Sequence, residues 1–188
     1  MSDGLFEDAV AVLSNWSATS DAADLNRKRT LELLGAGPAA MARAHRAGHV
    51  TASALVVDPA GRLLLCLHGR MGKWMQLGGH CEAGDPTLAA AALREATEES
   101  GIHGLILDRD PIDVDIHPVL CKAAGGEPAT PTRHFDVRFL LRCRAGAVEQ
   151  VSDESAALGW FRPDDLPSPL ASGMRNQIAP ALSRLPWF

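Results

Sequence analysis

GGHCEAGDPTLAAAALREATEESGI (residues 78–102) is the most informative segment of this chain, and it predicts a glycine loop, a helix and a stop. The helix is expected over residues 85–100. Asp85 is suited to cap its N-terminus and Pro86 suits its first position. Gly101 provides the exit at the C-terminus. The sequence therefore predicts an α-helix near the middle of the chain, with glycines before and after it.

Three glutamates gather on one side of this predicted helix. Glu95, Glu98 and Glu99 fall within an arc of about 100°, and each like-charge pair costs about 0.2–0.5 kcal/mol. They also lie near the C-terminal end of the helix, where its dipole disfavours anions. A bound Mg²⁺ or Mn²⁺ would offset both costs, because these ions take carboxylate oxygens. The alternative is a solvated acidic face, which is typical of charge runs; the Gly78-Gly79 loop, which lets backbone oxygens approach a ligand, favours the metal.

The segment resembles the Nudix box, G-x5-E-x7-R-E-U-x-E-E-x-G-U, in which U is a bulky aliphatic residue. Residues 94–102 match its second half in register, with a small Ala96, and Gly79 matches its first glycine. There are two departures. Asp85 stands where the box has glutamate, and eight residues rather than seven separate Asp85 from Arg94. We place the insertion at the helix start, where it changes the cap without rotating the glutamates.

The resemblance implies an α/β fold: an α/β/α sandwich around a mixed β-sheet, with the box as loop-helix-loop. Residue patterns along the chain agree, because strands and helices are intermixed without regular β-α-β alternation. We expect a helical N-terminal extension over residues 1–48 and a Nudix domain over residues 49–188. The expected elements are a short helix at 39–47, a hairpin of strands 49–57 and 62–66, strands at 102–107, 111–117, 133–143 and 159–161, and a final helix at 174–185.

For function, the resemblance implies divalent-metal-dependent hydrolysis of a diphosphate bond in a nucleotide-type substrate, by attack of water on phosphorus. Mg²⁺ or Mn²⁺ would reverse the local charge of an acidic protein and lower the pKa of bound water. By position, the metal ligands are Gly79 through its carbonyl, Glu95, Glu98 and Glu99.

The other box residues receive roles from the same resemblance. Arg94 would orient the carboxylates, and Asp85 would take the structural place of the usual glutamate. Glu98 is the first choice for the general base. Glu154, on a later loop, is the second choice, with an exposed loop residue as its alternative.

Substrate contacts are predicted at two places. Arg70 and Lys73 lie in a small basic cluster before the box, which could meet phosphates or could be solvated surface cations. On the alternating strands 111–117 and 133–143, polar side chains share one face, which could line a pocket or face solvent. The strand residues assigned to substrate binding are His117, His134 and Arg138, with Asp115 and Asp136 beside them.

Composition restricts the partners. The chain has 188 residues and a net charge of −5, which disfavours nucleic acid, and no apolar run approaches a membrane span. The start lacks the pattern of a signal peptide, so we expect the cytoplasm. The cysteines lack the Cys-x-x-Cys or Cys/His spacing of a zinc site and are expected to be reduced, mostly buried thiols. They are Cys66, Cys81, Cys121 and Cys143.

Two other functions remain open from the sequence. One is a non-hydrolytic Nudix-fold module for ligand sensing or regulation, against which the intact glutamate set argues. The other is an isoprenoid diphosphate isomerase, which needs added acid and thiol groups for which Cys66 and Cys81 are not obviously placed. The expected partner is a small-molecule diphosphate, with a homodimer left open. ADP-ribose, oxidised nucleoside triphosphates, dinucleoside polyphosphates and nucleotide sugars would share the same catalytic helix.

Overall fold

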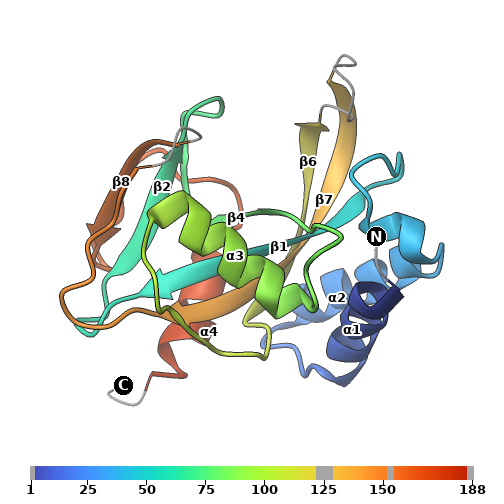
Figure 1. Cartoon of the computed structure of the whole chain (residues 1–188), viewed down its shortest axis with the longest axis horizontal. Coiled ribbons are helices and arrows are strands. Elements are labelled where there is room, and N and C mark those ends of the chain that lie inside the picture. The colour runs from blue at the N-terminus through green and yellow to red at the C-terminus, as the bar shows by residue number, and fades with distance from the viewer. Residues whose placement is uncertain (1–2, 122–128, 152–154, 186–188) are drawn as a thin grey trace.

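The structure, a computed structural model, describes residues 3–121, 129–151 and 155–185 (Figure 1). A mixed eight-stranded sheet lies between helices. Its strands are β1 (His49–Val57), β2 (Leu63–His68), β3 (Trp74–Met75), β4 (Leu77–His80), β5 (Ile106–Leu107), β6 (Asp113–Cys121), β7 (Thr130–Arg142) and β8 (Ser155–Phe161). The helices are α1 (Asp3–Asn15), α2 (Asp21–Leu34), the 3-10 helix η1 (Pro38–Met41), α3 (Leu88–Ser100), the 3-10 helix η2 (Met174–Gln177) and α4 (Ile178–Leu182).

The buried strand β1 organises the sheet. It pairs in parallel with β7 over its whole length, from His49 opposite His134 to Val57 opposite Arg142. On its other side it pairs antiparallel with β4 and then with β2, so that β4 and β2 diverge from one strand. Likewise, β7 pairs first with β6 and then with β5. The expected fold, a mixed sheet with helices on both faces, is confirmed.

Alternating side chains give the sheet two different faces. Val50, Ala52 and Ala54 of β1 point into the larger core, which also contains apolar residues of α1, α2 and α3. Leu55 and Val57 point into a smaller core beneath α4. Burial of this apolar surface on both faces is the main stabilisation of the layers. The N-terminal half of β1 carries polar residues on the second face, and these belong to the site described below.

Several element boundaries differ from the sequence-based expectations. Helix α3 begins at Leu88 rather than at residue 85, because Thr87 is its N-cap: the Thr87 side chain accepts a 3.0 Å hydrogen bond from the Ala90 amide. Asp85 is therefore not the cap, and Pro86 precedes the helix.

Several other elements also differ from the expected bounds. In place of the helix expected at 39–47 there is only the four-residue η1, and the C-terminal segment is split between η2 and α4. The strand expected at 102–107 is reduced to β5, and the strand expected at 159–161 begins earlier, as β8. The pair of strands β6 and β7 is longer than expected, reaching Cys121 and starting at Thr130. The hairpin of β1 and β2 and the helices before it form as predicted. Among the described helices, none combines the length and apolarity needed to cross a membrane.

Candidate active site

Helix α3 packs against β1 and β4, so its glutamates meet the two glycines of β4 (Figure 1). Gly78 lies opposite Ser53 and has a φ of +146°, and a Cβ there would approach the Ser53 Cβ to 2.3 Å. A Cβ on Gly79 would lie 2.7 Å from Oε2 of Glu95. The absence of a side chain at both positions therefore lets the backbone of β4 come directly against the carboxylates of α3.

Arg94 is the centre of the hydrogen bonding around the box. Its Nε donates to Oδ1 of Asp85 at 2.9 Å, and its Nη2 donates to Oδ2 at 3.0 Å. Its Nη1 lies 3.1 Å from one oxygen each of Glu95 and Glu98. Nη2 also donates to the carbonyl of His80 at 2.9 Å. One guanidinium thus ties the loop before α3 to two of its glutamates, and Asp85 helps to raise the pKa of that guanidinium.

Asp85 lies in the loop between β4 and α3 and is buried, with 5% of its surface exposed. Burial alone would raise its pKa, but hydrogen bonds from Arg94 and from the Glu82 amide outweigh burial and lower it. The Glu82 amide donates to Oδ2 at 2.7 Å. Asp85 is therefore held by Arg94 and by the backbone of its own loop, and it lies before Leu88, outside the helix.

The remaining glutamates differ in their surroundings. The Glu98 side chain is 60% exposed, so water can reach it. Oε2 of Glu99 accepts a 3.0 Å hydrogen bond from the Gly78 amide. Carboxylate oxygens next to a backbone carbonyl are the donor types that Mg²⁺ and Mn²⁺ take. The close approach of Gly79 to the carboxylate of Glu95 fits such an ion.

The polar strand face forms as the alternation predicts. His117 lies opposite His134, and Asp115 lies opposite Asp136, in the antiparallel pair of β6 and β7. Nδ1 of His117 is 2.9 Å from Oδ2 of Asp115. The structure thus brings together three of the five residues assigned to substrate binding: His117 lies opposite His134, and Arg138 contacts the same Asp115 oxygen as His117.

Arg138 is only 1% exposed, and its guanidinium is held by carboxylates of its own chain. It makes ion pairs with Asp113 at 3.0 Å, Asp115 at 2.9 Å and Asp136 at 3.1 Å. Nη1 also donates to the Gly173 carbonyl at 2.9 Å. Burial raises the pKa of Asp113 despite Arg138. These contacts make Arg138 the link between β6, β7 and the segment before η2.

Asp136 receives further hydrogen bonds from the neighbouring strand β1. Thr51 Oγ1 donates to it at 3.0 Å and Ser53 Oγ at 2.7 Å, and both residues belong to β1. Burial would raise the pKa of Asp136, but Arg138 leads the contacts that lower it. Sequence reasoning missed Thr51 and Ser53, because only the register of β1 against β7 shows that they share a face with Asp136.

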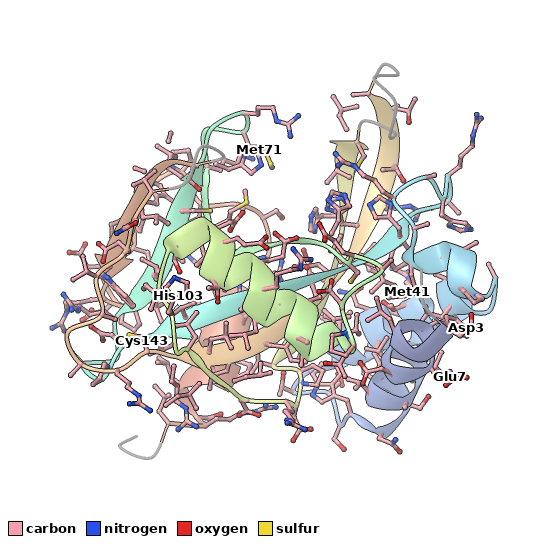
Figure 2. All side chains as sticks on the ribbon, in the orientation of Figure 1. Asp3, Glu7, Met41, Met71, His103 and Cys143 are labelled. Carbon is pink, nitrogen blue, oxygen red and sulfur yellow. The ribbon has the colours of Figure 1, made fainter. Side chains whose placement is uncertain are left out.

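The other assigned residues lie apart or outside the described chain. Arg70 and Lys73 are exposed in the loop between β2 and β3. Figure 2 places Met71, which lies between them in sequence, at the end of the sheet toward which β6 and β7 also extend. Glu154, the second candidate base, lies outside the described residues.

The thiols considered for an isomerase are buried. Burial, followed by the negative charge of Glu99, raises the pKa of Cys66 to about 12. Burial, followed by Asp85, raises the pKa of Cys81 to about 12. Neither side chain is therefore suited to form a reactive thiolate at neutral pH, and the structure gives no support to an isomerase that depends on them.

Comparisons with known proteins agree with this geometry. A MutT-like protein of Streptomyces ambofaciens is 31% identical over 134 residues, covering 71% of this chain and 76% of that protein. The MutT NUDIX hydrolase of Burkholderia pseudomallei has a structure with a TM-score of 0.52 and 30% identity, covering 70% of this chain and 96% of its own. An ADP-ribose pyrophosphatase of Streptococcus suis has a TM-score of 0.52 and 26% identity, covering 73% and 92%.

The family model that describes the NUDIX domain matches residues 47–182, which include every described strand and α3. The match thus spans the glycines of β4, the ion pair of Arg94 with Asp85, and the glutamates of α3. On the fold, the box and these relatives together, the chain belongs to the Nudix family of hydrolases.

Proposed function

We propose that this hydrolase cleaves a diphosphate bond in a nucleotide-type substrate and depends on a divalent ion held by α3. The ligands we assign are the carboxylates of Glu95, Glu98 and Glu99 and the carbonyl of Gly79. The observation that carries the proposal is the contact between β4 and α3, in which a Cβ on Gly79 would lie within 2.9 Å of three atoms of the Glu95 carboxyl group. Gly78 is required by the close pairing with Ser53, whereas the absence of a side chain at Gly79 lets its backbone and the Glu95 carboxylate reach a common ligand.

The residues around the ligands have separate tasks. Arg94 orients Glu95 and Glu98 through Nη1, and Asp85 holds the guanidinium in position from the loop. Mg²⁺ or Mn²⁺, when bound, supplies Lewis acidity and lowers the pKa of a bound water. Glu98 is placed to accept a proton from attacking water, because it is the exposed member of the set. Glu154 is the second choice for this base.

Substrate contacts are assigned to two regions. Arg70 and Lys73 would meet the phosphates from the exposed loop before β3. His117 and His134 lie opposite each other on the polar strand face, where ring nitrogens offer hydrogen bonds to a ligand. For His134, this substrate contact and the metal site proposed below are alternative roles. Arg138 is assigned a positioning role, since its donors are taken by Asp113, Asp115 and Asp136.

The test is turnover of a diphosphate panel with Mg²⁺ or Mn²⁺ before and after removal of metal by a chelator. The panel contains ADP-ribose, oxidised nucleoside triphosphates, dinucleoside polyphosphates and nucleotide sugars. We expect metal-dependent release of phosphate or nucleoside monophosphate from at least one compound. A non-hydrolytic sensing module would bind such compounds without consuming them, and that result would overturn the proposal.

The general base is tested with Glu98→Gln. Loss of a general base costs about 10²- to 10⁴-fold in kcat. The matched control is Glu32→Gln, which changes an exposed glutamate on α2 and should leave turnover unchanged. If Glu98→Gln keeps wild-type turnover with every active compound, the base assignment is wrong, and Glu154→Gln is measured next.

A further inference from the structure

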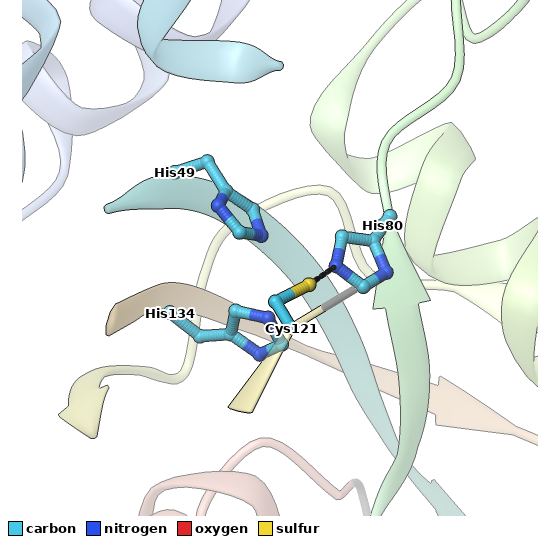
Figure 3. Close-up of side chains that lie close together, drawn as sticks. All are labelled: His49, His80, Cys121 and His134. Carbon is cyan, nitrogen blue, oxygen red and sulfur yellow. Dashed lines mark hydrogen bonds between the residues drawn. The ribbon is translucent and has the colours of Figure 1, made fainter. Parts of the chain in front are cut away.

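Four side chains of types that can ligate a metal, from four strands, meet at one place on the polar face of the sheet (Figure 3). His49 begins β1, His80 ends β4, Cys121 ends β6 and His134 lies near the start of β7. Each offers one ligand atom, and these four atoms all lie within 4.8 Å of one another. We call these residues the histidine–cysteine cluster.

Strand register explains why these distant residues converge. His49 is directly opposite His134 in the parallel pair of β1 and β7. His80 lies opposite Thr51, two residues beyond His49, in the pair of β1 and β4. The three imidazole rings lie 4.8 to 5.1 Å apart between centroids. All three therefore project from the same face into one small volume, as Figure 3 shows.

The cluster leaves buried polar atoms without partners. His49 is 0% exposed, and neither of its ring nitrogens has a hydrogen-bond partner. Nε2 of His134 is also buried without a partner. An unsatisfied buried polar atom costs about 1–3 kcal/mol. A ligand that accepts lone pairs from these rings would remove part of that cost.

The protonation state suits a metal ligand. Burial, followed by the charge of Arg43, lowers the pKa of His49 to about 4. Burial, followed by the neighbouring His80, lowers the pKa of His134 to about 3. At neutral pH these two rings are therefore uncharged and keep a lone pair for a cation.

The surroundings of the sulfur complete the donor set. Sγ of Cys121 lies 3.4 Å from Nε2 of His80. Nε of Arg43 donates to the same sulfur at 3.1 Å, a contact that suits an anionic thiolate ligand. His117, whose ring centroid is 5.6 Å from that of His134, and Asp136 are the neighbouring titratable groups on β6 and β7.

We propose that His49, His80, Cys121 and His134 bind a divalent transition-metal ion of the zinc class, in a site that is not part of the carboxylate set of α3. Imidazole and thiolate are zinc ligands, whereas Mg²⁺ takes oxygen. Four protein donors leave no open position, as in structural zinc sites. The ion would fasten the ends of β4 and β6 to β1 and β7.

The geometric change that binding requires is small. Tetrahedral zinc with nitrogen and sulfur at about 2.0–2.3 Å has ligand atoms about 3.3–3.6 Å apart. The present separations reach up to 4.8 Å, so rotations about the side-chain bonds of the histidines and Cys121 bring the donors into range. The competing state is a metal-free cluster in which the Cys121 thiol donates a hydrogen bond to His80.

The test is Co²⁺ binding to the full chain after chelator treatment, followed by optical absorption with Mg²⁺ in excess. Magnesium occupies oxygen ligands and does not compete for imidazole and thiolate. We expect saturable tetrahedral cobalt bands together with thiolate-to-cobalt charge transfer, and their displacement by Zn²⁺. Weak octahedral bands alone, without charge transfer, would overturn the proposal.

Cys121→Ser should abolish the charge-transfer band and weaken Co²⁺ binding by more than about 100-fold, beyond the loss expected for an outer-shell partner. Cys143→Ser is the matched control, because Cys143 is also buried but follows β7 about 30 Å along the strand direction from His134. Figure 2 shows Cys143 on the side of the molecule away from Met41, which precedes Arg43. An unchanged spectrum in Cys121→Ser would refute the site.

Folding is monitored independently of the spectrum. Zn²⁺ should raise the Tm of the wild type and of Cys143→Ser, and should raise that of Cys121→Ser less, because a metal that binds only the folded state stabilises it. Equal Zn²⁺-dependent shifts in all three proteins would place the ion elsewhere. Hydrolase activity plays no part in either measurement, so failure of this site and failure of the proposed function are distinguishable.

Discussion

Arg94 donates two hydrogen bonds to the Asp85 carboxylate, from Nε to Oδ1 at 2.9 Å and from Nη2 to Oδ2 at 3.0 Å. The same guanidinium reaches Glu95 through Nη1. The loop before α3 is therefore connected to a proposed metal ligand through a single side chain. Because Asp85 replaces the glutamate of the usual box, its shorter side chain makes this contact from a loop with one additional residue.

We expect Asp85→Asn to lower the free energy of unfolding by about 2 kcal/mol at neutral pH, since a hydrogen bond to a charged group contributes about 1.5–3 kcal/mol. The pKa of Asp85 is lower in the folded chain than its ordinary 3.8. Its stabilisation is therefore complete above 3.8 and is lost as pH falls through the lower folded value. Urea denaturation across this pH range measures the difference between the two proteins.

The control for Asp85 is Asp164→Asn, which breaks an ion pair with Arg162 whose two side chains are 70% and 71% exposed. Solvent screens this pair, so its loss should leave the unfolding midpoint at neutral pH nearly unchanged. The free energy of unfolding of Asp85→Asn should approach that of the wild type once pH is below the folded pKa of Asp85. If the difference between the two proteins is as large there as at neutral pH, the assigned ion pair is contradicted.

Gly79→Ala tests the approach of β4 to α3. The new Cβ would lie 2.7 Å from Oε2 of Glu95 and must displace that carboxylate. We expect kcat in saturating Mg²⁺ to fall by about 100-fold, as a displacement of about 1 Å can cause. Gly84→Ala is the control, because no atom lies within 4 Å of its added Cβ. Wild-type kcat in Gly79→Ala would mean that Glu95 is not a ligand.

Arg138→Met tests the buried ion-pair cluster. The substitution leaves Asp113, Asp115 and Asp136 without their shared cation. Removal of one partner from a buried pair costs about 3–5 kcal/mol, and we expect a loss of that size in chemical denaturation. Arg133→Met, at an exposed position on the same strand, should change the free energy of unfolding by less than about 0.5 kcal/mol. Equal effects of the two substitutions would contradict this account.

Arg70→Ala and Lys73→Ala test the proposed phosphate contacts. Both side chains are exposed, and an exposed ion pair contributes about 0.2–1 kcal/mol. Each substitution should therefore raise KM by up to about fivefold with kcat unchanged. The effect should shrink as salt screens the charges. The control is Arg29→Ala, at an exposed position on α2. If Arg29→Ala raises KM as much as Arg70→Ala or Lys73→Ala does, the effect reflects net charge rather than contact with substrate.

Much of the site could be predicted from local patterns. The spacing of Glu95, Glu98 and Glu99 places them on one side of any α-helix, whatever surrounds it. The alternation along β6 and β7 correctly placed His117 with His134. The capping of α3 was predicted wrongly, because Asp85 and Thr87 are both good cap residues and only the engagement of Asp85 by Arg94 leaves the cap to Thr87.

No short sequence motif indicates the histidine–cysteine cluster. Its residues lie at positions 49, 80, 121 and 134, without the short Cys/His spacing that identifies most zinc sites in a sequence. His49 opposes His134 because β1 and β7 pair in parallel, a register that depends on contacts between segments far apart in the chain.

By itself, then, the order of residues determined the helix that carries the three glutamates, the polar and apolar faces of the strands at 111–117 and 133–143, and the family. These features depend on periods of a few residues, which local backbone geometry sets. The tertiary structure alone decided that Asp85 holds Arg94 from the loop before α3, that Arg138 is buried among three aspartates, and that four strands bring His49, His80, Cys121 and His134 together. Strand pairing and packing of the two cores create these contacts, and neither is a property of any short segment.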